Sequence, residues 1–393
     1  MKIALVHDYL SEFGGAERVL LALSELWPEA PIYTAFYSKG SSAWKRFKDR
    51  DIRVSWFHFL PFCSRLASPL RFLAPFVWGS FNFSSYDVVI SSANWYITKG
   101  LKKGSSLTSP STTGSEQART IEICYCHTPP RYLYGYPTAV EWRRYWPVRV
   151  YGELVGHFLR MYDFSAAQRV DWFVANSKNV AARIQKFYRR DSTVIYPPVD
   201  ISVQRLASSV QGKRDYYLVV SRIVGGKGLE LAIKACNRLR RPLKVVGKPA
   251  GWGSAGRRLR QLAGNTIEFL DEVPDEELAE LYAGAKAFLA TAEDEDFGMT
   301  PVEAMAAGTP VVAFRGGGYV ESVIDPSTSS GQATGVFFDE LTIESLVSAI
   351  KRLERISISP QACRRQAKKF SKARFHKEMK AFVEQCVYEM RNS

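Results

Sequence analysis

Two glutamates eight residues apart, Glu295 and Glu303, are the first candidates for chemistry. Between them, Gly298 lies shortly before a predicted helix, and glycine lets a backbone approach a ligand closely. The N–H groups at 299–301 favour a phosphate, although Pro301 contributes none. Carboxylates before the helix and in its first turn can accept hydrogen bonds from sugar hydroxyls. The spacing therefore predicts a site for a phosphorylated, hydroxyl-rich ligand.

The same helix also has a purely structural interpretation. Thr300 suits the N-cap, Pro301 the first helical position and Glu303 the third position of a capping box. Gly308 suits the residue just beyond the C-terminal end. Both interpretations of Glu303 stay open at this point.

Two cations follow another predicted strand. Arg222 and Lys227 lie in the loop Ser221–Gly228, where an arginine can chelate phosphate oxygens and a lysine supplies a point charge. The loop lacks the ending of a Walker motif. The alternative is that both side chains are ordinary surface charges.

Two further features follow predicted strands in the first half of the chain. His127 comes directly after the apolar run 121–126, where α/β folds place ligands, but a packing role is equally open. The Gly14-Gly15 loop follows the run 3–6 and precedes a helical pattern from 16 to 27. Such a helix start can bind an anion, or the glycines can simply form a tight turn.

Apolar runs alternate with helical spacing along the chain, which predicts parallel, doubly wound α/β sheets. The pattern restarts after Pro197-Pro198, so two such domains divide near residue 200, and a basic helical region follows at 361–390. Helices are predicted at 150–170, 177–189 and 229–239. Strands are predicted at 3–6, 86–91, 121–126, 172–175, 194–196, 217–220, 243–246, 267–270, 287–290 and 311–314.

Composition narrows the class of protein. The 393 residues are 46% hydrophobic and 23% charged, which is typical of a globular chain with full cores. The net charge of +14 favours anionic partners such as nucleic acid, anionic lipid or phosphorylated small molecules. No nucleic-acid motif appears. The six cysteines form no CxxC pair and predict reduced, buried thiols without a metal site.

The segment 54–83 is rich in aromatic residues and has arginine as its only charged residue type. It predicts either core-packing helices or an aromatic and basic membrane-interface surface. No apolar run is long enough to span a bilayer, and no secretory signal is visible. We expect a cytoplasmic protein or one attached peripherally to the inner face of the membrane. The Ser/Thr-rich stretches 104–118 and 326–333 predict inserted loops.

Taken together, the motifs resemble family 4 of the retaining, GT-B-type glycosyltransferases. The resemblance rests on Arg222 to Lys227, the Glu295 and Glu303 pair and the Gly14-Gly15 loop. His-Asp-Tyr at 7–9, Cys-His-Thr-Pro-Pro-Arg at 126–131, Asn176-Ser177 and 196–200 are similar to a subgroup that uses GDP-mannose. The resemblance to the family covers nearly the whole chain apart from the two Ser/Thr-rich stretches.

The resemblance implies a fold and an assignment of residues. It implies an N-terminal Rossmann-like acceptor domain (1–200), a nucleotide-sugar domain (201–375) facing it across a cleft, and a helix (376–393) returning to the first domain. Arg222 and Lys227 would hold the diphosphate. Glu303 would bind the ribose and Glu295 the 3-hydroxyl of the sugar. Backbone contacts would come from Gly298, Met299 and Thr300, with Gly15 over the diphosphate and His127 beside the sugar ring.

The implied reaction transfers mannose from GDP-mannose to a saccharide acceptor, expected to be lipid-linked. Arg222, Lys227 and the helix start would stabilise charge on the leaving diphosphate, so neither a cofactor nor a metal is expected. Three alternatives are weighed against it. They are a UDP-sugar-dependent enzyme of the same fold, an epimerase or nicotinamide dehydrogenase, and a non-enzymatic basic protein that binds membranes or nucleic acid. The first glycine loop lacks the G-x-G-x-x-G pattern, which disfavours a dehydrogenase.

Overall fold

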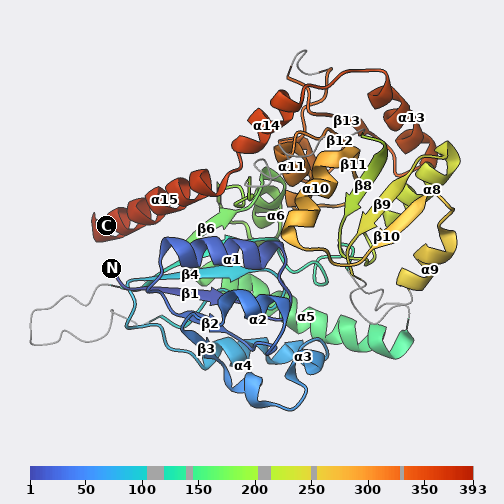
Figure 1. Cartoon of the computed structure of the whole chain (residues 1–393). Helices are drawn as coiled ribbons and strands as arrows, with labels where there is room; N and C mark the ends of the chain where they lie inside the picture. Colours follow the sequence, from blue (N-terminus) through green and yellow to red (C-terminus); the bar gives the residue numbers. More distant parts are fainter. Residues whose placement is uncertain (104–118, 139–144, 202–213, 249–254, 328–331, 393) are drawn as a thin grey trace, which may run out of the picture. The chain divides into compact units, whose positions relative to one another are not determined.

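The computed structural model describes residues 1–103, 119–138, 145–201, 214–248, 255–327 and 332–392 (Figure 1). The predicted loop at 104–118 and part of the one at 326–333 lie outside these residues. The chain forms two compact units. Unit 1 comprises Met1–Gly135, Tyr145–Pro198 and Phe375–Ser393, and unit 2 comprises Tyr136–Arg144 and Val199–Arg374.

Unit 1 contains a seven-stranded sheet in the order β3-β2-β1-β4-β5-β6-β7, and every neighbouring pair is parallel. Every residue of the three central strands is buried, because helices cover both faces of a parallel sheet. The strands are β1 (Ile3–His7), β2 (Ile32–Thr34), β3 (Ile52–Val54), β4 (Val88–Ala93), β5 (Ile121–Cys126), β6 (Trp172–Ala175) and β7 (Thr193–Val194).

The helices of unit 1 come from both ends of the chain. Phe375, Met379, Val383 and Cys386 of the last helix are buried in the same core as β1 and the first helix (Figure 1). The helices are α1 (Gly15–Leu26), α2 (Ser42–Phe47), η1 (Trp56–Phe59), α3 (Cys63–Leu66), η2 (Arg71–Leu73), α4 (Ala74–Gly79), α5 (Trp146–Arg169), α6 (Lys178–Tyr188) and, from Phe375 onward, α15 (Lys372–Asn392).

Unit 2 contains a six-stranded parallel sheet in the order β10-β9-β8-β11-β12-β13. Its strands are β8 (Tyr216–Val220), β9 (Leu243–Val246), β10 (Ile267–Leu270), β11 (Ala285–Ala290), β12 (Val311–Phe314) and β13 (Gly335–Phe338). Its helices are α8 (Leu229–Leu239), α9 (Ala255–Leu262), α10 (Asp275–Gly284), α11 (Met299–Ala306), α12 (Tyr319–Ser322), α13 (Ile343–Glu354) and α14 (Pro360–Lys368).

The predicted α/β class with two doubly wound parallel sheets is confirmed. Several elements differ from their predicted bounds, and for two of them the structure shows a reason. The helical region 361–390 is divided between α14 and α15, because the Phe370 carbonyl accepts a hydrogen bond from the Val199 N–H (2.9 Å). The strand predicted at 194–196 is β7 and ends at Val194, shortly before two prolines that cannot donate to a ladder.

Each sheet has a point at which the strand order reverses. In unit 1 this point lies between β1 and β4, and in unit 2 between β8 and β11. Open α/β sheets bind ligands beyond the carboxyl ends of the strands at such a point. The segments that follow β8 and β11, and those that follow β1, β4 and β5, are therefore where functional side chains are expected.

The aromatic segment 54–83 supplies both core and surface. Phe57, Trp78 and Phe83 are fully buried, while Phe59 and Phe62 are more than 70% exposed. The structure thus bears out the core-packing interpretation for part of the segment and leaves the rest at the surface.

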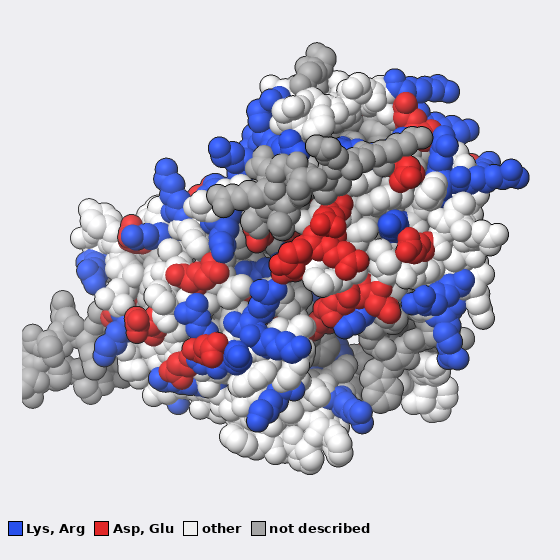
Figure 2. Space-filling view, viewed as in Figure 1, with Lys and Arg blue, Asp and Glu red and all other residues white. Residues whose placement is uncertain are grey.

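Within the described residues, no helix is long and apolar enough to cross a membrane. On the face shown in Figure 2, lysine and arginine side chains are scattered over the surface, and acidic side chains gather near its middle.

All six cysteines are free thiols, and Cys63 is only half-buried where burial was predicted.

Candidate functional site

Two loops flank the reversal point of the unit 2 sheet. The first, Ser221–Gly228, joins β8 to α8 and carries Arg222 and Lys227. The second, Thr291–Gly298, joins β11 to α11 and carries Glu295. The Thr291 hydroxyl donates a hydrogen bond to the Lys227 carbonyl (3.1 Å), so the two loops are fixed to one another.

Lys227 and Glu295 form an ion pair between these loops. The Lys227 Nζ atom lies 2.7 Å from Glu295 Oε2, and the two side chains are 31% and 19% exposed. A pair that stays in reach of water retains its charges and can exchange partners, unlike a fully buried one. A diphosphate could therefore compete for the ammonium group, and a sugar hydroxyl for the carboxylate. The Arg222 side chain is exposed at the start of the same loop.

A glycine-rich turn after β12 supports Glu295. The Gly318 N–H donates to the Glu295 carbonyl (2.8 Å). Gly317 has φ +56°, and a Cβ atom there would lie 2.3 Å from that carbonyl oxygen. Only glycine combines this φ with so close an approach. Our sequence reasoning missed this turn, although the run Gly316-Gly317-Gly318 directly after a strand was a visible signal.

Helix α11 begins two residues earlier than predicted. Its N-cap is Gly298 at φ +85°, so Met299 and Thr300 are the first two helical residues, and the capping box predicted at Thr300 is wrong. The reason is the left-handed conformation of Gly298, which turns the chain into the helix without a side-chain cap. This helix start follows directly after the loop that carries Glu295. The predicted end is confirmed, since Gly308 has φ +85° beyond the C-cap Ala307.

Glu303 lies inside α11 and is only 3% exposed. Its Oε2 atom accepts a hydrogen bond from the Tyr282 hydroxyl of α10 (2.8 Å). A buried carboxylate needs such donors, because an unsatisfied one is costly. Tyr282 was missed at the level of sequence, since nothing in its spacing from Glu303 indicates the contact.

His127 lies in unit 1, directly after β5, and is 7% exposed. Its Nε2 atom is 2.9 Å from the Ser92 hydroxyl, which is 3.0 Å from Nδ1 of His7. Burial, with a smaller effect of the His7 charge, lowers the pKa of His127 from 6.5 to about 3. The ring is therefore neutral at physiological pH. Ser92 and His7 were not predicted as site residues.

The Gly14-Gly15 loop is joined to the same group of side chains. Gly14 is the N-cap of α1 and Gly15 its first residue. The Gly14 N–H donates to Glu17 Oε2 (2.8 Å), and Glu17 Oε1 lies 3.4 Å from Nε2 of His7. The loop and His127 are therefore connected through side chains at the reversal point of the unit 1 sheet.

The structure thus forms two groups from the predicted site residues. In unit 2 it joins Lys227 to Glu295 and places the start of α11 directly after the same loop. In unit 1 it connects the glycine loop to His127. Among the described residues, no three His, Cys, Asp or Glu side chains are grouped so that they could hold a metal ion.

Two family models match the chain. The one described as Glycosyltransferase Family 4 matches residues 13–203, and the one described as Glycosyl transferases group 1 matches residues 201–370. Together they span 13–370, so the chain belongs to the glycosyltransferases, the class of transferase that both models describe.

Curated relatives match over part of their length. A D-inositol 3-phosphate glycosyltransferase of Geodermatophilus obscurus is 31% identical over 228 residues, which are 51% of this chain and 49% of that protein. A second protein of that name, from Mycobacteroides abscessus, is 28% identical over 47% of this chain and 44% of its own length. The chain spans about half the length of the curated relatives it matches.

Solved structures match along the whole chain. The Anabaena protein Alr3699/HepE in complex with UDP-glucose has a TM-score of 0.68 at 16% identity, covering 98% of this chain and 100% of that one. Sucrose-phosphate synthase from Thermosynechococcus elongatus has a TM-score of 0.66 at 16% identity, covering 99% and 100%. At this identity the likeness concerns the fold, which is of the GT-B type.

Proposed function

We propose that the chain is a retaining glycosyltransferase that moves mannose from GDP-mannose to a lipid-linked saccharide in surface polysaccharide or glycolipid synthesis. The observation that carries the proposal is the Lys227–Glu295 ion pair at the reversal point of the unit 2 sheet. It puts a cation for a diphosphate and a carboxylate for a sugar hydroxyl next to each other, directly before a helix start.

Each residue has a role in the proposed reaction. Arg222 and Lys227 hold the diphosphate, Glu303 binds the ribose, and Glu295 takes the 3-hydroxyl of the donor sugar. The anomeric C–O bond to the diphosphate breaks with oxocarbenium character. The acceptor hydroxyl then attacks the same face of the sugar, and its proton passes to the leaving diphosphate. Charge develops on that diphosphate, which preorganised cations stabilise most effectively.

Metal independence is part of the proposal. Arg222 and Lys227 supply positive charge where other transferases use a divalent cation. We expect activity to survive EDTA and to fall strongly in Lys227→Ala.

A UDP-hexose is the second candidate donor. The observation that favours it is the likeness to the Anabaena protein, which was solved with UDP-glucose. The proposed roles of Lys227 and Glu295 are the same for either nucleotide, because they concern the diphosphate and the sugar.

The test is a thermal-shift panel with GDP, GDP-mannose, UDP-glucose, UDP-N-acetylglucosamine and NADH, followed by product analysis by NMR. A ligand at 100 times its Kd stabilises the folded state by about 2.7 kcal/mol, a readily measured shift. We expect GDP and GDP-mannose to stabilise the wild type and Lys234→Ala, a control lysine of α8 that pairs with Glu230. Arg222→Ala and Lys227→Ala should lose the shift. Stabilisation by NADH alone, or a product of inverted configuration, would refute the proposal.

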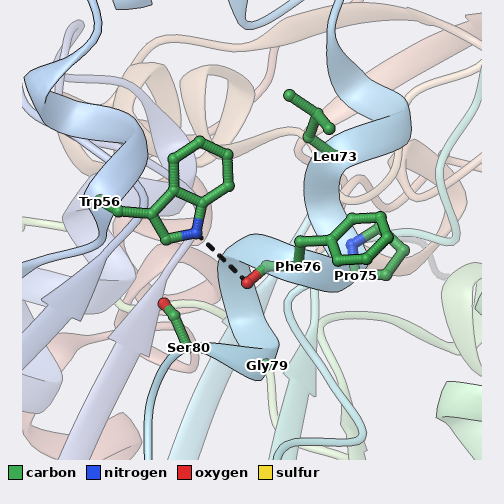
Figure 3. Close-up of a pocket in the computed structure, with 6 residues that line it drawn as sticks. All are labelled: Trp56, Leu73, Pro75, Phe76, Gly79 and Ser80. Atoms are coloured by element: carbon green, nitrogen blue, oxygen red, sulfur yellow. Dashed lines mark hydrogen bonds between the residues drawn. The ribbon is translucent and has the colours of Figure 1, made fainter.

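We further propose that unit 1 binds an anionic membrane surface, which is where a lipid-linked acceptor resides. A shallow apolar cavity of about 600 Å³ is lined by Trp56, Leu73, Pro75, Phe76, Gly79 and Ser80 (Figure 3). The Trp56 indole N–H donates to the Phe76 carbonyl (3.4 Å), which holds the ring at the rim. Aromatic rings at a surface of this kind are typical of membrane interfaces.

Helix α5 carries a second group of exposed apolar side chains. Trp146, Leu154, Phe158 and Met161 are each more than 60% exposed, although the opposite face of the helix is buried. The Tyr151 hydroxyl donates to the Pro69 carbonyl, which joins the start of α5 to the aromatic segment. Between Asp51 and Asp87 the sequence has no acidic residue and three arginines. Arg53 is paired with Asp51, and Arg65 is exposed, so the charge that this segment offers to anionic lipid comes mainly from Arg65.

Vesicle flotation tests this surface. We expect the protein to float with phosphatidylglycerol vesicles at low salt and to remain in solution with phosphatidylcholine alone. Phe76→Ser combined with Phe158→Ser should abolish flotation, while Tyr388→Ser, at an exposed aromatic residue of α15, should not. A dimer in light scattering that depends on Phe158, without flotation, would overturn the membrane assignment.

A further inference from the structure

Four side chains of unit 1 form one continuous series of hydrogen-bonding contacts. Glu17 Oε1 lies 3.4 Å from His7 Nε2, His7 Nδ1 lies 3.0 Å from Ser92 Oγ, and Ser92 Oγ lies 2.9 Å from His127 Nε2. His7 ends β1, Ser92 is its register partner on β4, and His127 follows β5. His7 and Ser92 are 1% and 0% exposed, so the middle of this chain of contacts is buried, while the Glu17 side chain at its end is 13% exposed.

The direction of each hydrogen bond follows from which atoms can donate and which can only accept. The Glu17 carboxylate can only accept, so Nε2 of His7 must carry the proton that faces it. When His7 carries only this one ring proton, its Nδ1 is an acceptor, and the single hydroxyl proton of Ser92 points to it. The Ser92 oxygen is left to accept from His127, whose Nε2 must therefore be protonated. The backbone N–H of Gly14 fixes the other oxygen of Glu17 (2.8 Å).

We propose that Glu17, His7 and Ser92 act as positioning residues that hold His127 in the tautomer protonated at Nε2. In this tautomer Nδ1 is an acceptor. Because Nε2 is used within the chain of contacts, any hydrogen bond from the ring to a substrate must be made by Nδ1. Resting on the proposed function, this makes His127 an acceptor for a sugar hydroxyl and excludes it as a proton donor to the leaving group.

The tautomer can be read directly, without substrate. The full chain labelled with ¹⁵N-histidine gives two-dimensional NMR signals in which protonated and unprotonated ring nitrogens have widely different shifts. His127→Gln assigns the signals of that ring. We expect Nε2 of His127 to be protonated and Nδ1 unprotonated in the wild type. In Ser92→Ala the two nitrogens should move toward a mixture of tautomers.

Ser91→Ala is a matched control on the same strand. Ser91 is also fully buried, but its hydroxyl donates to Glu122 (3.2 Å) and takes no part in the chain of contacts. Both alanine variants lose one buried hydroxyl, so a merely structural effect would be similar in the two. Only Ser92→Ala should change the His127 shifts. Glu17→Gln, whose amide can either donate or accept, is a second variant and should also mix the tautomers.

A kinetic experiment tests whether this positioning affects the proposed reaction. With a turnover assay, Ser92→Ala should lower kcat about tenfold and leave the KM for the nucleotide sugar unchanged, because one oriented hydrogen bond is lost. A wild-type His127 protonated at Nδ1, or unchanged shifts in both Ser92→Ala and Glu17→Gln, would overturn the proposal. If no sugar transfer is found but the tautomer is as expected, the proposed function fails and the positioning chain stands.

Discussion

The low pKa of His127 predicts a specific loss of stability in mild acid. The folded chain protonates this buried ring only near pH 3, whereas the unfolded chain does so near its ordinary value of 6.5. Between these values the unfolded state binds more protons than the folded state, so stability falls as the pH is lowered. The effect begins as the pH falls below about 7 and is complete near pH 3.

The size of the effect follows from the two pKa values. Each unit of difference corresponds to about 1.4 kcal/mol, so the full difference amounts to roughly 5 kcal/mol. Most of this loss of stability occurs at pH values lower than those of ordinary assays. Between pH 7 and pH 5 the linkage relation gives about 2 kcal/mol. For a unit of this size, that is a fall in Tm of roughly 4–8 °C.

The assay is urea unfolding of the wild type and His127→Asn at pH 7 and pH 5, followed by tryptophan fluorescence. The wild type should lose about 2 kcal/mol more than the variant, because asparagine does not titrate. Carboxylates that titrate in this range affect both proteins and cancel in the comparison. His157→Asn, at an exposed histidine of α5, should behave as the wild type. Equal losses in the wild type and His127→Asn would refute the reasoning.

Three further predictions concern packing around the two sites. Tyr282→Phe should cost about 1–3 kcal/mol, read from chemical unfolding, because buried Glu303 loses a donor; an unchanged midpoint would contradict this. Gly317→Ala should raise the KM for the donor more than tenfold while circular dichroism is retained, because the new Cβ would displace Glu295; an unchanged KM would show that this turn does not position the site. Lys99→Met should lower the free energy of unfolding by about 3–5 kcal/mol, because it leaves the buried carboxylate of Asp163 without its cation; a stabilised variant in a thermal melt would count against it.

The strands of the unit 2 sheet could be predicted because they are short and mostly apolar. Leu243–Val246 and Ile267–Leu270 have the predicted bounds, although each contains one charged residue. The strand predicted at 86–91 is instead Val88–Ala93, since Ser91 and Ser92 extend it. Polar residues usually mark the end of a strand, but these two have buried partners from distant parts of the chain. Such contacts leave no trace in local spacing.

The candidate site likewise contains residues that local spacing predicts and contacts that it does not. Lys227 and Glu295 could be proposed from their loops, because a strand followed by glycine and charge is a local pattern. The Tyr282–Glu303 contact joins two helices and depends on how they pack, which local spacing does not reveal. The capping prediction at Thr300 failed because three residue types fitted a common pattern while Gly298, at φ +85°, already started the helix.

The shared core of β1, α1 and α15 has a consequence for how the chain is made. Phe375, Met379, Val383 and Cys386 leave the ribosome only after Val199–Arg374 has been synthesised. At about 5–20 residues per second, those 176 residues take roughly 9–35 s. During that interval the nascent first unit exposes the apolar groove that α15 will fill. Exposed apolar surface of this kind favours aggregation, and unit 1 completes its core only when α15 packs onto it.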